Sequence, residues 1–264
     1  MRGLYASLWA ESLKVRKSQI FWITLSAFSF VGILVGLMVL VVKYPALVGQ
    51  STLISAKSSS SSFFMDDWHS YFELLIQLVL GFGLLGFGVV SGWVFGREYV
   101  DRVVTDLLAL PIHRSTIVMS KFIIVIIWSF LLSITIFLFG LLTGLAVNIA
   151  GWSVGITYHY FFIFLGASIL TILLCTPVAF IASFTRGYLA PVGFVIATLF
   201  ITNILPVGIP SIIPYVPWAI PALSTGLLGP NFPYPGIASY IIVFSYIILG
   251  VIATLVWWRF ADQT

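Results

Sequence analysis

Long apolar runs alternate with short polar stretches along this chain, and the alternation predicts a bundle of membrane-spanning helices. A helix needs about 20 mostly apolar residues to cross a bilayer. Runs of about that length or longer, without a formal charge, are Ile20–Val42, Leu74–Gly96, Phe122–Thr185, Leu189–Val207 and Ser239–Trp258. The third run is long enough for two spans joined by a turn near 148–158, so we expect six transmembrane helices in an all-α integral membrane protein.

The N-terminal segment, residues 1–19, predicts an interfacial amphipathic helix. Its polar residues recur at helical spacing, as Ser7, Glu11, Lys14 and Ser18. The apolar residues on the other face are Leu4, Tyr5, Leu8 and Trp9, of which Trp9 is an interfacial anchor. The apolar run that follows exceeds the roughly 7 to 15 residues of a signal-peptide core, so we expect it to remain as the first span.

The most highly charged stretch runs from Arg97 to Lys121, between the second and third spans. If Glu98–Leu110 forms a helix, one face carries Val100, Val103, Val104, Leu107 and Leu108, and the other carries Glu98, Asp101, Arg102, Thr105 and Asp106. Pro111 ends such a helix, and Ser115 can begin the next one. A helix that only lies on lipid is usually rich in Lys and Arg alone. The mixed charges favour a docking element for a soluble partner, although lipid contact also fits.

Small residues recur in the second span. Gly88, Gly92 and Gly96 lie four residues apart and share one helix face. Glycines at this spacing let another helix approach closely, which is a main source of helix association in membranes. The approaching helix could belong to the same chain or to a second subunit, and the spacing does not distinguish the two.

Prolines disturb two of the predicted helical regions. Pro177 lies inside the fourth span and should kink it, and the carbonyl that it leaves free can accept a hydrogen bond from Thr176 or from a neighbouring helix. Eight of the twelve prolines fall between Pro206 and Pro235. No continuous spanning helix forms at that density. We therefore expect residues 206–236 to be an external re-entrant segment of short broken helices.

Composition and charge agree with a membrane protein and give its orientation. Hydrophobic residues make up 61% of the chain and charged residues 8%, against about 25% charged in soluble domains. Ten of the twelve Lys and Arg residues fall on the side of the predicted termini. The positive-inside rule then makes both termini and the 97–121 segment cytoplasmic. The net charge of +4 is thus an orientation signal, and we expect no nucleic-acid partner.

Few side chains in the sequence are suited to chemistry. A Gly-rich phosphate loop ending in Lys and Ser or Thr is absent from the sequence, so the chain does not hydrolyse nucleotide by that route. The predicted spans lack ionisable residues near the midplane, which disfavours both an ion-coupled carrier and an intramembrane hydrolase. Asp66, Asp67, His69 and Glu73 offer metal-ligand atoms, but they also make an ordinary polar entry to the second span. We expect no catalytic residue, metal site or cofactor in this chain.

The charged stretch also carries a family resemblance. Its pattern of Glu98, Thr105, Leu107, Leu108, Pro111, Arg114 and Lys121, together with the N-terminal Glu11–Ser18 and the six-span plan, resembles the ABC-2 type permease family. Val104 stands where many members have Gly. Among subfamilies the chain looks most like small permeases of bacterial peptide-antibiotic export and immunity systems, including bacitracin-resistance types. A bacterial cell membrane is the expected location.

The resemblance implies a role and a set of partners. Members are membrane subunits of ATP-binding-cassette transporters, with two permease subunits, in a homodimer or a heterodimer, and two ATPase subunits that bind ATP and Mg²⁺. The stretch after the second span is then the coupling helix, and Glu98, Asp101, Arg102, Thr105, Asp106, Leu107, Leu108, Pro111 and Arg114 contact the ATPase. Apolar, Phe-rich spans suit an amphipathic or lipid-like compound better than a small ion, although such faces also simply meet lipid. The resemblance to peptide-antibiotic export permeases implies an exporter of an amphipathic, peptide or lipid-like compound. A membrane anchor or sensor of the same fold that does not transport is the alternative.

Overall fold

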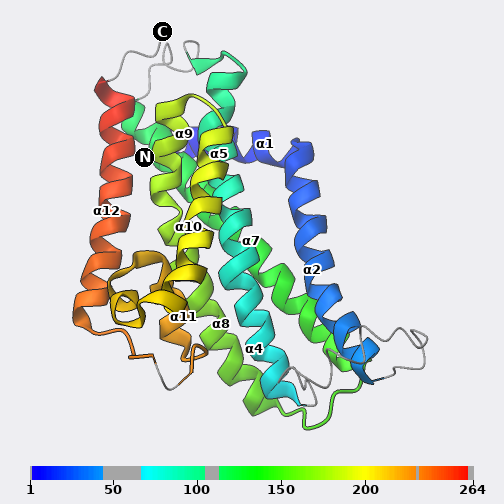
Figure 1. Cartoon of the computed structure of the whole chain (residues 1–264). Coiled ribbons are helices and arrows are strands. Elements are labelled where there is room, and N and C mark those ends of the chain that lie inside the picture. Colours follow the sequence, from blue (N-terminus) through cyan, green and yellow to red (C-terminus); the bar gives the residue numbers. More distant parts are fainter. Residues whose placement is uncertain (1, 44–66, 105–112, 230–231, 261–264) are drawn as a thin grey trace.

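A computed structural model describes residues 2–43, 67–104, 113–229 and 232–260 of the chain. Long helices run side by side, and α1 lies across one end of them (Figure 1). In chain order the helices are α1 (Arg2–Arg16), α2 (Gln19–Lys43), α4 (Trp68–Leu78), the π-helical turn η2 (Val79–Gly83), α5 (Leu84–Val100), α7 (Arg114–Ala146), α8 (Val154–Leu174), α9 (Thr176–Thr185), α10 (Leu189–Gly208), the 3₁₀ helices η3 (Pro210–Tyr215) and η4 (Pro217–Ala219), α11 (Ile220–Thr225) and α12 (Ile237–Phe260).

Five helical stretches in the described residues are long and apolar enough to cross a membrane. They are Gln19–Val41, Trp68–Val100, Arg114–Ala146, Val154–Thr185 and Ile237–Phe260. The all-helical membrane architecture expected from the sequence is therefore present. The remaining expected span, Leu189–Val207, corresponds to α10, whose apolar stretch Leu189–Leu205 is shorter than the five above. The count of six spans stays a prediction.

Two of these stretches are interrupted helices. The second is α4, η2 and α5 in direct succession, so that one π-helical turn lies within it. The fourth is α8 and α9, which meet at Cys175 just before Pro177. There the hydroxyl of Thr176 lies 3.0 Å from the carbonyl oxygen of Leu173, the acceptor that Pro177 cannot reach because it lacks an N–H. The helix is thus interrupted beside Pro177, and the hydrogen bond of Thr176 to the freed carbonyl is present.

The polar face of α1 is turned toward the bundle, and its apolar face is turned outward. Ser7 and Glu11 are buried, whereas Tyr5 is 73% exposed and Trp9 is 58% exposed. The Ser7 hydroxyl lies 2.7 Å from the hydroxyl of Ser120 on α7. This orientation suits an interfacial helix, because exposed aromatic side chains meet the membrane surface while polar ones find partners in the protein.

The proline-rich segment after α10 folds into short helices at the end of the bundle opposite α1 (Figure 1). Ile213 of η3, Ala219 of η4 and Ile220 of α11 are buried, and the segment packs against α8, α10 and α12. Broken helices are what the proline density predicted. How deeply the segment enters a membrane stays a prediction.

Candidate functional site: the charged end of the helix bundle

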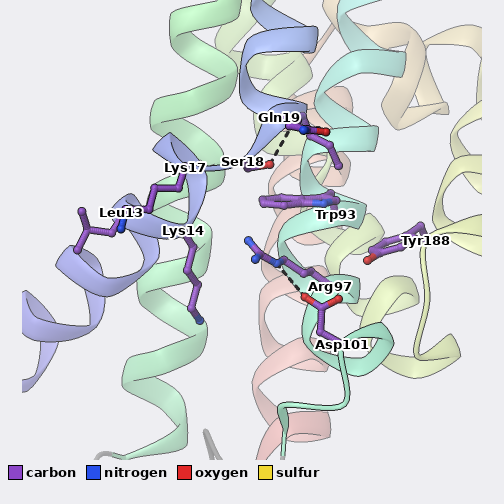
Figure 2. Close-up of a pocket in the computed structure, with 10 residues that line it drawn as sticks. Leu13, Lys14, Lys17, Ser18, Gln19, Trp93, Arg97, Asp101 and Tyr188 are labelled. Carbon is purple, nitrogen blue, oxygen red and sulfur yellow. Dashed lines mark hydrogen bonds and ion pairs between the residues drawn. The ribbon is translucent and has the colours of Figure 1, made fainter.

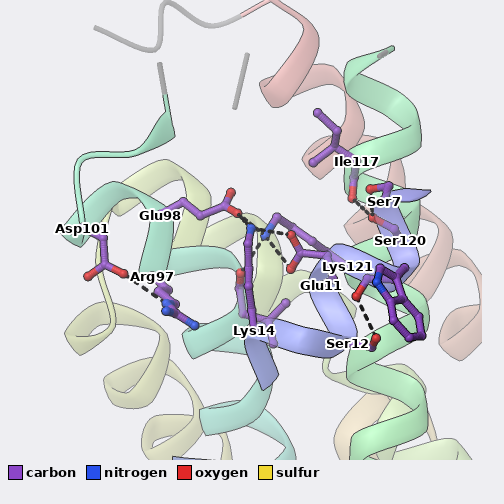
Figure 3. Close-up of polar contacts among 12 residues, drawn as sticks. Ser7, Glu11, Ser12, Lys14, Arg97, Glu98, Asp101, Ile117, Ser120 and Lys121 are labelled. Atoms are coloured by element: carbon purple, nitrogen blue, oxygen red, sulfur yellow. Dashed lines mark hydrogen bonds and ion pairs between the residues drawn. The ribbon is translucent and has the colours of Figure 1, made fainter. Parts of the chain in front are cut away.

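Four charged side chains meet where α1, α5 and α7 come together, at the end of the bundle that we call the charged end. Lys121 Nζ of α7 lies 2.8 Å from Glu98 Oε1 of α5 and 3.2 Å from Glu11 Oε2 of α1. Lys14 Nζ of α1 lies 2.9 Å from Glu98 Oε1 and 2.8 Å from Glu11 Oε1. Figure 3 shows the two ammonium groups between the two carboxylates. We call these four residues the ion cluster.

The ion cluster is electrically neutral and mostly excluded from solvent. The Lys121 side chain is 1% exposed and that of Glu98 is 3% exposed, while Lys14 at the rim is 35% exposed. Lys121 also donates to the backbone carbonyl of Val94, 3.2 Å away. Burial lowers the pKa of Lys14, but the carboxylates of Glu98 and Glu11 more than offset this and raise it overall. Because each buried charge depends on the others, loss of one member leaves an uncompensated charge.

Glu98 therefore lies in a different place from the one expected. It belongs to the last turn of α5 and is buried, whereas the sequence placed it on the exposed polar face of a helix running to Leu110. The prediction of a continuous helix over Glu98–Leu110 is wrong in its first part, because α5 ends at Val100. Arg102 adopts a left-handed φ of 56°, and the Val103 N–H bonds the Glu98 carbonyl at 3.0 Å, as in a Schellman C-cap.

The residues just beyond α5 are accessible from outside the bundle. Asp101 is the C-cap of α5, its side chain is 46% exposed, and its Oδ2 accepts a hydrogen bond from Arg97 Nε at 3.0 Å. Arg102 is exposed. Val104, expected on an apolar face, is buried. Asp101 and Arg102 thus remain available to a partner, whereas Glu98 does not.

The second half of the expected coupling segment is only partly described. Thr105, Asp106, Leu107, Leu108 and Pro111 lie outside the described residues. Arg114 is the first residue of α7, and His113, rather than Ser115, precedes it as the N-cap. Arg114 Nη1 lies 3.3 Å from the carbonyl oxygens of Trp258 and Arg259 in the last turn of α12. A cation at these carbonyls complements the negative end of the helix.

The three spaced glycines of α5 face α10 and the turn that precedes it, within the same chain. A Cβ atom on Gly88 would lie 2.4 Å from Val195 Cγ2, and one on Gly92 would lie 3.1 Å from Pro191 Cβ. A Cβ atom on Gly96 would lie 2.8 Å from the Gly187 carbonyl oxygen. Of the two readings left open by the spacing, the contacts in this chain match packing within one subunit.

From the sequence, the members of the ion cluster are expected in two separate elements. Glu11 and Lys14 belong to the interfacial helix, and Glu98 and Lys121 belong to the charged stretch between the second and third spans. One signal was available, since Lys121 borders a long uncharged run and Glu98 lies two residues after the end of another, in a chain with few charges. Charges at such depths are usually paired, because an unpaired one is costly in the membrane. Complementary sign at matching ends of neighbouring spans was therefore a usable indication.

The residues near the other end of the second span have a structural explanation. Asp67 is the N-cap of α4, and its carboxylate accepts a hydrogen bond from the Ser70 N–H at 3.1 Å. This bond lowers the pKa of Asp67. His69 Nδ1 lies 3.3 Å from the Tyr160 hydroxyl. Among the described residues these groups do not form a set of three or more that could hold a metal ion.

Comparisons with known proteins give a relative and a family for this chain. The chain is 27% identical over 191 residues to the bacitracin transport permease protein BCRB of Bacillus licheniformis, an alignment that covers 72% of this chain and 89% of that protein. The family described as ABC-2 family transporter protein matches residues 7–204. That match spans α1 to most of α10, more than half of the chain, and the protein therefore belongs to the ABC-2 family of transporters.

Proposed function

We propose that this chain is the permease subunit of a bacterial exporter of an amphipathic, peptide or lipid-like compound. Family membership makes it a transmembrane subunit of an ABC transporter and implies a separate ATP-binding-cassette ATPase. The name of the Bacillus licheniformis relative, a bacitracin transport permease, supports a peptide antibiotic as the kind of compound to test first. ATP and Mg²⁺ belong to the ATPase, and two permease and two ATPase subunits make the assembly.

One observation carries the proposal for how the ATPase drives this chain. The segment 98–114 is tied to the bundle at both of its ends, by Glu98 in the ion cluster and by Arg114 on the last carbonyls of α12. A displacement of this segment by a docked protein is therefore transmitted to α1, α5, α7 and α12 together. Rigid contacts of this kind transmit the movement of a docked protein to membrane helices, whereas a loosely held loop would absorb it.

The residues of the segment divide into two roles under this proposal. Asp101, Arg102, Thr105, Asp106, Leu107, Leu108 and Pro111 form the surface that docks on the ATPase. Glu98 and Arg114 anchor that surface to the bundle and do not touch the ATPase. Carboxylates in the docking surface pair with Arg or Lys of the partner and fix the orientation of docking.

The experiment separates docking from anchoring by changing them independently. The double variant Asp101→Ala and Asp106→Ala should insert normally and lose co-purification of the ATPase. Glu98→Gln should keep the ATPase bound and lose stimulation of ATP hydrolysis by the transported compound. Glu73→Gln, an acidic residue near the opposite end of the second span, is the matched control and should change neither property.

Transport itself distinguishes an exporter from a membrane anchor or sensor of the same fold. Bacitracin is the first probe, in cells that express this chain with its ATPase. Export predicts lower cell-associated bacitracin with the wild-type chain than with the docking variant. Equal accumulation for a panel of peptide antibiotics in the two strains would reject the exporter and favour the anchor or sensor. Full ATPase co-purification and transport by the docking variant would reject the docking surface.

A further inference from the structure

A pocket of about 560 Å³ opens at the charged end, beside the ion cluster. The last turn of α1 and the start of α2 line one side, and α5 lines the other, with Tyr188 from the turn before α10 (Figure 2). The pocket contains the basic residues Lys14, Lys17 and Arg97 and the acidic residue Asp101. Of the residues that line the pocket, Lys14 and Asp101 also take part in the coupling role described above, whereas Lys17 and Arg97 do not.

Arg97 is held in a fixed position with part of its hydrogen-bonding capacity unused. Its Nε donates to Asp101 Oδ2, and its guanidinium carbon lies 4.9 Å from the centre of the Trp93 ring. In Figure 2 the guanidinium points into the space between α5 and α1. Its Nη1 is buried and has no hydrogen-bond partner within the described part of the chain, and such an unpaired donor is costly. The Arg97 side chain as a whole is 33% exposed, so an acceptor that enters the pocket can reach the guanidinium.

The surroundings of Arg97 favour an anion. Lys17 is exposed at the rim and adds a positive charge, whereas the charge of Lys14 is already balanced within the ion cluster. The first residues of α2, Gln19 and Ile20, also line the pocket, and the N-terminal end of a helix of this length is partially positive. Asp101 holds Arg97 from one side only. A planar guanidinium beside a helix N-terminus suits phosphate oxygens particularly well.

The pocket lies at the level where lipid headgroups are expected. Directly after the pocket, α2 exposes Trp22 (60%) and Ile23 (63%), and α1 exposes Tyr5 and Trp9. Exposed Trp and Tyr mark the membrane interface, and the apolar residues that follow meet acyl chains. Leu13, Ile20 and Trp93 add apolar surface to the pocket wall. A ligand here can therefore place its charge on Arg97 and its hydrocarbon along α2.

We propose that this pocket binds the phosphate headgroup of an anionic lipid, with Arg97 as the main contact and Lys17 at the rim. The recognised chemistry is a phosphate ester, and the amphipathic surroundings select a lipid over free phosphate. The bound lipid bridges α1, α2 and α5 next to the ion cluster, so it supports the position of α1 from the side that faces the membrane.

The test measures lipid retained by the purified chain, together with its ATPase where that co-purifies. Native mass spectrometry after reconstitution in phosphatidylcholine with a minor fraction of phosphatidylglycerol should show one phosphatidylglycerol retained per chain. Arg97→Gln should weaken this retention about tenfold or more, as expected for loss of charge-assisted hydrogen bonds. Arg16→Gln, which removes an exposed charge of α1 that does not line the pocket, should leave retention unchanged.

A further variant separates binding from a structural role of Arg97. Asp101→Asn weakens the anchor of Arg97, because the amide oxygen accepts without a negative charge, and it removes the negative charge in the pocket, so retention should persist or increase. Loss of retention in Asp101→Asn as in Arg97→Gln would overturn the proposal, because the pair would then be structural. Equal retention of phosphatidylcholine, or displacement of the lipid by a low concentration of inorganic phosphate, would also overturn the proposal. Displacement of one lipid for each ATPase bound would overturn it as well, because the pocket would then belong to the contact with the partner.

Discussion

Lys121 is a buried cation on which three helices depend, because it bonds Glu98, Glu11 and the Val94 carbonyl from within α7. We predict that Lys121→Met lowers the free energy of unfolding by about 3–5 kcal/mol, since it leaves two buried carboxylates with only Lys14 as partner. Arg16→Met, at an exposed position of α1, should cost about 0.5 kcal/mol or less. Unfolding of the purified chain in detergent measures both.

A double-mutant cycle tests whether pairing is the reason for that loss. Lys121→Met combined with Glu98→Gln removes one charge of each sign from the ion cluster. The double variant should therefore lose less stability than the sum of the two single variants. Simple additivity would show that Lys121 stabilises the fold through packing alone, and the pairing explanation would be rejected.

Glu98 also shows how far single residues could be predicted from the sequence. Helical spacing correctly separated it from the apolar residues of its own stretch. Spacing says nothing about which polar face meets another helix, and the burial of Glu98 is decided by Lys14 and Lys121, which lie 84 and 23 positions away along the chain. The sequence does not show which helices contact one another, so a polar residue at the border of a span is predicted to be exposed.

At the scale of elements, the contact of α5 with α10 depends on the absence of side chains on α5. Gly88→Ala should destabilise the chain by about 1–3 kcal/mol, because the new Cβ atom would overlap the buried Val195 side chain. Adding Val195→Ala should restore part of the loss by making room. Gly166→Ala on α8, where a Cβ atom meets nothing within 4 Å, should cost nothing. An unfolding midpoint for Gly88→Ala equal to that of wild type would contradict this packing.

The orientation of α1 gives a second prediction at this scale. In a Cys175→Ser background, which removes the single cysteine of the sequence, Tyr5→Cys should react rapidly with a small membrane-permeant maleimide. Ser7→Cys should react much more slowly, because Ser7 is 8% exposed and packs against Ser120. Reversed rates would mean that α1 presents its apolar face to the bundle.

Element boundaries were predicted well where proline set them and poorly where it did not. Pro177 and the prolines after α10 exclude continuous helices by their covalent structure, so their effects were visible in the sequence. The end of α5 was not, because the left-handed position that usually holds Gly is occupied by Arg102. The expected helix ran past Val100 because the sequence has no glycine there to mark a helix end, and not because the hydrophobic pattern was misjudged.

At the scale of the whole molecule, the charge distribution predicts which end faces the cytoplasm. In the Cys175→Ser background, Ser115→Cys at the charged end should be protected from an impermeant maleimide in intact cells and react after lysis. Ser60→Cys, in the serine run Ser58–Ser62, should react in intact cells. Labelling of Ser115→Cys from outside would invert the topology and would also rule out a cytoplasmic ATPase docking on 98–114.

The ion cluster sets an order of events during synthesis. Glu11 leaves the ribosome 110 residues before Lys121, which corresponds to roughly 5 to 20 seconds of translation. During that interval the newly made α1 carries an unmatched polar face, and its exposed Tyr5 and Trp9 hold it at the membrane surface. Insertion of α7 completes the charge balance and captures α1. The N-terminal helix is thus the first element synthesised, but it reaches its final place only after α7 has been inserted.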